Sequence, residues 1–127
     1  MWRSLVRLIV RNVMAKVFYL HWNRDEAEAR AAALKKAGHD VHFHWSPEEH
    51  VKLGDFKPEA VVISLDRLPS HGRAVAEWFW EAKKRHSIPI VFAGGAPDKV
   101  EATRAKFPRA IFCASDEVSK VLDKVLT

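Results

Sequence analysis

Histidine is the residue type in this chain that could take part in the widest range of chemistry, and seven histidines occur among its 127 residues. His42 and His44 stand two residues apart within an apolar stretch, and His21 follows an earlier one. Imidazoles at i and i+2 of a strand lie on one face and can share a zinc ion. The same alternation is typical of polar side chains on a half-exposed edge strand, and we favour that interpretation. We therefore predict no metal site and no cofactor.

No catalytic motif accompanies these histidines. The sequence contains no HExxH pair, no GxSxG nucleophile turn and no glycine-rich loop of the P-loop kind. We predict that the protein is not an enzyme. The single cysteine, Cys113, lies in an apolar run and has no second cysteine to pair with, so a cytoplasmic location is the default expectation.

A second group of residues that could bind a ligand follows the apolar runs of the chain. If these runs are parallel strands, the group lies at their carboxyl ends, outside which open α/β sheets bind ligands. A pair of glycines after the fourth run would let backbone N–H groups approach an anion. We predict that any small ligand or partner loop binds at this edge, on His21, Trp22, Ser64, Asp66, His71, Gly94 and Gly95.

Short apolar runs alternate with amphipathic segments from Lys16 onwards, a pattern typical of βαβ units. Right-handed crossovers then favour a single α/β domain with three layers. In this arrangement helices cover both faces of a doubly wound, five-stranded parallel sheet. We expect strands at 16–20, 41–45, 60–65, 88–93 and 110–113, and five helices in all.

Capping signals set the first helix boundaries. Asn23, with Glu26 three residues later, forms a capping box ahead of an alanine-rich segment. Ser46 and Pro47 indicate a second, short helix, which Gly54 ends.

The later helices are set by apolar spacing and by flanking residues. The third helix is expected to bury Trp78 and Phe79 on one stripe and to turn Trp80 elsewhere, toward an exposed contact. The fourth is expected at 97–106, because a proline opens it and another follows it. Ser115 is expected to cap the last helix.

The net charge of +5 is concentrated in two places. Three arginines at i, i+4 and i+8 make residues 1–14 a basic amphipathic extension ahead of a domain at 15–127. Residues 83–85 are cations at a predicted helix end, where they offset the helix dipole. The extension is too short to span a bilayer, and no nucleic-acid motif is present. We expect it to pack on protein, within the chain or in a homodimer; an interfacial membrane helix and an incidental extension are the alternatives.

From Lys16 to Leu126 the chain resembles a bacterial response-regulator receiver domain. The resemblance rests on residues 60–72, AVVISLDRLPSHG, where a strand is followed by a proline and then a glycine, as around the family's phosphoacceptor aspartate. The spacing from His21 to Gly38 also matches that from the family's acidic pair to its helix-ending glycine. The resemblance implies a flavodoxin-like fold with strand order 2-1-3-4-5.

The family's phosphorylation chemistry does not carry over. Its magnesium-binding acidic pair is replaced by His21 and Trp22, and Leu65 takes the phosphoacceptor position four residues before the proline. Asp66 is one residue off, and Gly94 stands where the family has threonine or serine. A hard divalent cation needs oxygen ligands. We therefore predict a phosphorylation-independent pseudo-receiver that acts in signalling or regulation by binding another protein or itself.

Cobalamin-binding domains share this fold and supply the alternative. They carry a histidine after the first strand, a serine in the third and a Gly-Gly turn after the fourth, and His21, Ser64 and Gly94 with its neighbour occupy comparable places. The rest of their motif differs, with Tyr19 in place of its aspartate. A small-ligand site, for a cobalamin or an anion, is thus the second function considered.

Overall fold

The computed structural model describes residues 15–126, and the predicted extension at 1–14 lies outside the described residues. All strand pairs are parallel, and Val17 lies opposite both Val41 and Ala60. The predicted α/β fold and strand order are confirmed. The strands are β1 (Lys16–Leu20), β2 (Asp40–His44), β3 (Ala60–Ser64), β4 (Ile90–Ala93) and β5 (Ile111–Cys113), in the order β2-β1-β3-β4-β5.

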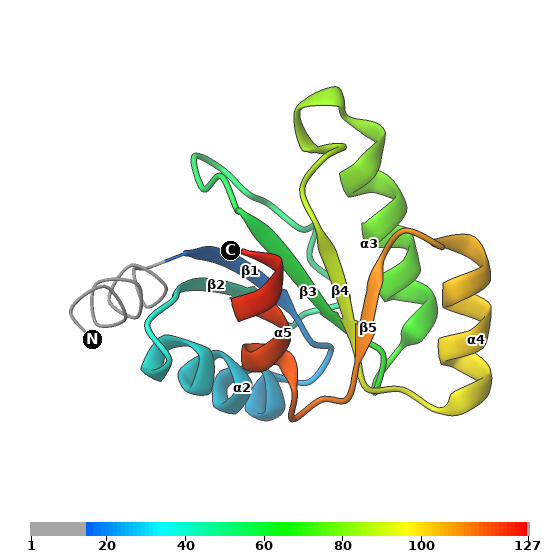
Figure 1. The fold of residues 1–127 in the computed structure, drawn as a ribbon, viewed down its shortest axis with the longest axis horizontal. Coiled ribbons are helices and arrows are strands. Elements are labelled where there is room, and N and C mark those ends of the chain that lie inside the picture. The colour runs from blue at the N-terminus through cyan, green and yellow to red at the C-terminus, as the bar shows by residue number, and fades with distance from the viewer. Residues whose placement is uncertain (1–14, 127) are drawn as a thin grey trace, which may run out of the picture.

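Helices cover both faces of this sheet. Helices α2 and α5 lie on one face, and α3 and α4 lie on the other (Figure 1). No helix in the described part of the chain is long and apolar enough to cross a membrane. The helices are α2 (Arg24–Lys36), α3 (Pro69–Glu81), α4 (Pro97–Lys106) and α5 (Val118–Val125), with a short 3-10 helix, η1 (Lys83–Arg85), after α3.

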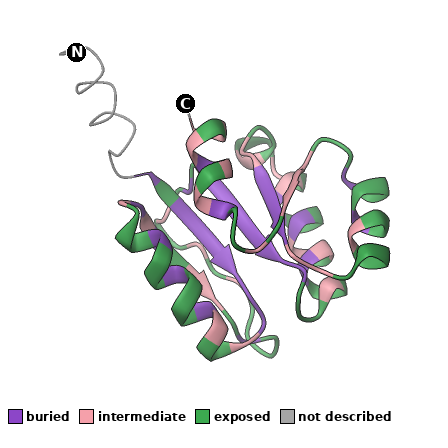
Figure 2. Cartoon of the chain, turned by 60° about the horizontal axis from the view of Figure 1, so that its bottom comes forward, coloured by how far each residue is buried: buried purple, intermediate pink, exposed green. Residues whose placement is uncertain are grey.

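Each face of the sheet buries its own apolar cluster. Successive residues of a strand point to opposite faces, so β1 sends Tyr19 to the cluster under α2 and α5 and Leu20 to the cluster under α3 and α4. The inner strands β1, β3 and β4 are therefore buried along nearly their whole length, whereas the edge strands β2 and β5 are only partly buried (Figure 2). This explains why Ala60–Ser64 is continuously apolar apart from its last residue.

The short helix predicted after Pro47 is absent. Residues 45–59 connect β2 to β3 without a helix. The stretch between Pro47 and Gly54 is too short for an isolated helix to be stable. The connection is held by other contacts, since Phe56 packs against the cluster under α3 and stacks on the His42 ring, with ring centroids 3.8 Å apart.

Helix α5 begins at Val118, so the predicted Ser115 cap is wrong. The Ser115 carbonyl oxygen accepts a hydrogen bond from Arg30 of α2 at 3.3 Å, and the Ser115 hydroxyl accepts another at 3.5 Å. Glu117 is the residue that precedes the helix. Because Ser115 is bonded to a neighbouring helix, it is not available to cap its own.

The two tryptophans of α3 have exchanged their expected roles. Trp78 is 39% exposed, with the Arg85 guanidinium 4.4 Å from the centre of its ring. Trp80 is half-buried, and its indole N–H donates to the Ile88 carbonyl oxygen at 2.8 Å. The buried face of α3 includes Gly72, where an added Cβ would lie 2.8 Å from the Ile63 side chain. This close approach to β3 fixes the rotation of the helix and turns Trp78 outward.

Candidate functional site

Four of the predicted edge residues form one hydrogen-bonded turn at the carboxyl ends of β3 and β4. The Gly95 N–H donates to Asp66 Oδ1 at 2.8 Å, and the Asp66 N–H donates to Ser64 Oγ at 3.2 Å. Gly94 and Gly95 have φ values of 71° and 96°, which favour glycine. A Cβ on Gly94 would lie 2.5 Å from Asp66 Oδ1. The glycines therefore let the β4 turn close over the Asp66 carboxylate.

His21 belongs to a separate, buried network. Its side chain is 2% exposed, with Nδ1 at 2.7 Å from the Tyr19 hydroxyl and Nε2 at 2.7 Å from Glu26 Oε1. The other oxygen of Glu26 accepts from Arg67 Nη2 at 2.6 Å. Both ring nitrogens of His21 are thus engaged, and the ring is not presented to a ligand at the edge.

The contacts in this network shift the pKa values of Glu26 and Tyr19. The hydrogen bond from Arg67, followed by that from His21, lowers the pKa of Glu26 to about 2. An ionised carboxylate only accepts, so Nε2 of His21 donates to it. In the tautomer that carries its proton on Nε2, Nδ1 accepts from the Tyr19 hydroxyl. Burial raises the pKa of Tyr19; the Arg30 charge opposes this rise, and the Asp66 and Glu26 charges add to it. The hydroxyl therefore stays protonated and can act as the donor.

Sequence reasoning did not identify three members of this network. Tyr19 could have been found, because residues two apart on a strand share a face with His21. Glu26 was assigned to a capping box, but only half of that box forms: Asn23 Oδ1 accepts the Glu26 N–H at 3.0 Å, while the Glu26 carboxylate binds His21 and Arg67. Arg67 lies 41 residues from Glu26, and no local pattern signals that contact.

Trp22 and His71 make a third group, on the α3 side of the edge. Their ring centroids are 5.8 Å apart, and the Trp22 ring also meets His44 edge-on at 5.6 Å. Trp22 is 8% exposed, and its buried indole N–H has no hydrogen-bond partner among the described residues. The seven predicted edge residues therefore divide into three local arrangements.

The strand histidines have structural contacts of their own. His44 Nε2 lies 2.7 Å from the Ser46 carbonyl oxygen, to which it can donate, and His42 stacks on Phe56. Within residues 15–126, no group of three or more His, Cys, Asp or Glu side chains is placed to hold a metal ion.

Replacing Arg67 with glutamine is expected to raise the pKa of Glu26 from about 2 toward its ordinary value of 4.5, because the largest cause of the lowering is removed. A depressed carboxyl pKa contributes stability that is present above the unfolded-state pKa and is lost as pH falls through the folded-state value. The variant should therefore gain less stability from Glu26 at neutral pH, and the acid loss of this smaller contribution should be complete at higher pH. An NMR titration of the Glu26 carboxyl carbon checks this, and an unchanged midpoint would contradict the assigned role of Arg67.

Comparison with solved structures identifies the class of fold. The chemotaxis response regulator CheY4 of Vibrio cholerae aligns with a TM-score of 0.70 at 15% identity, over 89% of this chain and 99% of that chain. A response regulator from Chloroflexus aurantiacus gives 0.69 at 16% identity, over 89% and 98%. The phosphorylated cyanobacterial phytochrome response regulator RcpA gives 0.63 at 12% identity, over 89% and 91%. The chain therefore has a receiver-like fold.

The sequence itself gives no such match. No protein-family model matches the chain, and no curated protein matches it. The likeness to receiver domains is accordingly one of fold, and function has to be argued from the residues at the carboxyl edge.

Proposed function

We propose that this domain acts in signalling or regulation as a receiver-like module that binds a protein partner, or a second copy of itself, without being phosphorylated. One observation carries the proposal. Leu65, at the position of the receiver phosphoacceptor, is 2% exposed within the apolar cluster under α3 and α4. A buried leucine has no oxygen to accept a phosphoryl group, and its burial makes it part of the core.

The residues around Leu65 support the same conclusion. Asp66, the nearest carboxylate, is already held by the Gly95 N–H in the turn that follows β4. The positions of the receiver acidic pair carry His21 and Trp22, which are 2% and 8% exposed. Neither offers the oxygen ligands that magnesium requires. Next to the position that performs phosphoryl chemistry in a receiver, His21 is instead bonded to Tyr19 and to Glu26.

Binding to a protein is supported by the aromatic residues that remain exposed. Trp78 is 39% exposed with Arg85 stacked on it, and Trp45 is also 39% exposed. Tryptophan and arginine are enriched among the residues that dominate binding energy at protein interfaces. These side chains give the domain surfaces on which a partner could be anchored.

Treatment of the full chain with acetyl phosphate and magnesium is expected to leave its intact mass unchanged, because the buried Leu65 stands at the position of the receiver phosphoacceptor. A functional receiver domain treated in parallel provides the positive control. A phosphate adduct that disappears in the Asp66→Asn variant would contradict the proposal, since it would show that Asp66 is phosphorylated in place of the missing acceptor.

A small-anion site is the second candidate function, and the unpartnered Trp22 N–H favours it. The cobalamin form of this alternative has less support. Coordination of cobalt by His21 would require one of its ring nitrogens to give up the bond to Tyr19 or to Glu26. The anion form requires no such rearrangement.

A further inference from the structure

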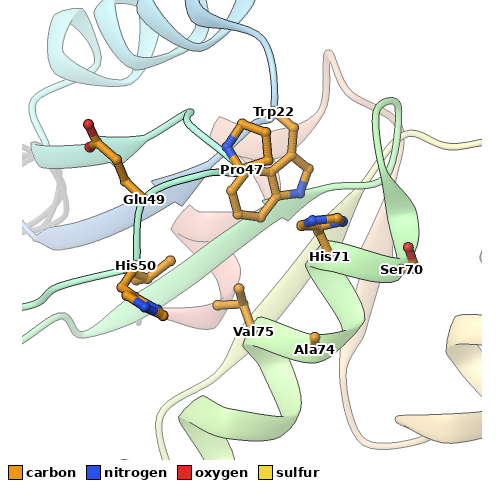
Figure 3. Close-up of a pocket in the computed structure, with 9 residues that line it drawn as sticks. Trp22, Pro47, Glu49, His50, Ser70, His71, Ala74 and Val75 are labelled. Carbon is orange, nitrogen blue, oxygen red and sulfur yellow. The ribbon is translucent and has the colours of Figure 1, made fainter.

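The connection between β2 and β3 borders a groove beside α3. Crossovers between parallel strands usually carry a helix, but residues 45–59 form none. The groove between this connection and the first turns of α3 has a volume of about 360 Å³ (Figure 3). Most of its lining is apolar. The apolar side chains are Trp22 after β1, Pro47 and Val51 in the connection, and Ala74 and Val75 of α3.

A hydrogen-bond donor in the wall of this groove lacks an acceptor among the described residues. Trp22 is 8% exposed, and its indole N–H is buried without a partner among the described residues. Buried donors are nearly always paired in native proteins, so an exception calls for an explanation. In Figure 3 the nitrogen-bearing edge of the Trp22 ring faces His71, at the α3 side of the groove. The His71 ring covers this edge, and because His71 is exposed, an acceptor that displaces its ring would satisfy the indole N–H.

The start of α3 adds a positive potential at the same place. The first-turn residues Ser70 and His71 line the groove. The residue before the helix, Leu68, has φ 43° and provides no side-chain cap, and the first turn contains no acidic residue. The His71 N–H already donates to the Leu68 carbonyl oxygen at 2.9 Å, but the helix itself supplies no negative side chain to offset its dipole.

The side chains on the opposite wall fit the same kind of ligand. His50 lines the groove from the connection and can offer an imidazole N–H. Glu49 also belongs to this wall, but its carboxylate is turned away from the Trp22 ring (Figure 3). A singly charged group with an apolar body matches these walls better than a strongly charged phosphate, which would be poorly solvated among them.

We propose that the groove binds a small apolar carboxylate. Its carboxylate lies between the Trp22 indole N–H and the first turn of α3, and its apolar body lies along Pro47, Val51 and Val75. This site rests on the second candidate function, the small-anion site, and specifies its ligand. It does not depend on the receiver-like function, because Asp66 does not line the groove. Phosphorylation of Asp66 would leave this inference standing, and an empty groove would leave the proposed function standing.

Titration of the full, ¹⁵N-labelled chain with phenylacetate tests the site. The Trp22 indole N–H resonance, assigned by its loss in Trp22→Phe, is expected to shift downfield and saturate with a dissociation constant on the order of 1 mM or tighter. Phenylethanol has the same ring without the charge, and acetate has the charge without the ring. Each is expected to bind at least about tenfold more weakly, since each lacks one half of the recognition.

Two serine variants localise the carboxylate. Ser70→Asp places a negative charge in the first turn of α3 and is expected to weaken phenylacetate binding about tenfold through repulsion at close range. Ser87→Asp makes the same change at another exposed serine, outside the groove, and is expected to bind as the parent chain does. Both changes lie outside the buried core, so neither variant threatens the fold.

The outcomes separate the proposal from its competitors. Equal binding of phenylethanol would overturn it, as would equal binding by Ser70→Asp, or shifts centred on Asp66 and Gly95 in place of Trp22. N-acetylglycylphenylalanine and its carboxamide then identify the source of the carboxylate. A peptide that binds more tightly than phenylacetate only as the free acid identifies a protein chain terminus, and tighter binding of phenylacetate identifies a free small acid. Either result supports a carboxylate site.

Discussion

The free energy of unfolding is expected to fall by about 2–3 kcal/mol when His21 is replaced by phenylalanine. Phenylalanine fills the volume of the imidazole but accepts no hydrogen bond, so the Tyr19 hydroxyl is left buried without its partner. Glu26 is less affected, because it is partly exposed and keeps its ion pair with Arg67. Urea denaturation of the two chains measures the difference.

A double-mutant cycle isolates the contact between His21 and Tyr19. Tyr19→Phe alone is expected to cost about 1–3 kcal/mol, because Nδ1 of the buried imidazole loses its donor. The double variant replaces both partners with apolar rings of similar shape and is expected to cost about 1–2 kcal/mol less than the sum of the single changes. Additive costs would contradict the buried hydrogen bond.

Replacing Gly94 with alanine is expected to destabilise the fold by about 2–4 kcal/mol. Part of this cost is the positive φ of 71°, and the rest comes from a Cβ that would meet the Asp66 carboxylate at 2.5 Å. To make room, Asp66 must move and lose its bond from the Gly95 N–H. Thermal or urea denaturation measures the loss.

A second glycine separates the two causes. Gly54 also has a positive φ, 57°, but a Cβ added to it would have nothing within 4 Å. Gly54→Ala is therefore expected to cost only about 1 kcal/mol, the backbone term alone. Adding Asp66→Ala to Gly94→Ala should recover part of the larger loss. If the two glycine variants lost the same free energy of unfolding, the close approach of Gly94 to Asp66 would not contribute to the cost of Gly94→Ala.

Local patterns in the sequence were sufficient to predict most of the strands and helices of the fold. The 16–20 strand and the 97–106 helix are confirmed residue for residue. In the first case an apolar run defines the strand, and in the second two prolines bracket the helix. The nearly continuous apolar character of 60–65 indicated a central strand, covered on both faces. These signals lie within the elements that they specify, which is why they could be interpreted without the structure.

The side-chain arrangement at the carboxyl edge depends on contacts between distant residues. His21 was placed at an exposed rim, but it is buried because Glu26 and Arg67 close over it from α2 and from the turn after β3. The outward turn of Trp78 depends on the depth at which Gly72 meets the sheet. No periodic pattern in the sequence signals either contact, so neither could be predicted without the structure.

The helix-free connection at 45–59 also predicts where a protease first cuts the domain. It joins an edge strand paired with β1 alone, and Lys52 and Lys57 are exposed along it. Opening this segment breaks few backbone hydrogen bonds, so its free energy should lie well below that of global unfolding. Within residues 15–126, trypsin is therefore expected to cut first after Lys52, because the bond after Lys57 leads into Pro58 and resists trypsin. The two fragments should remain together, because β1, on the amino-terminal side of the nick, still pairs with β3 on the other.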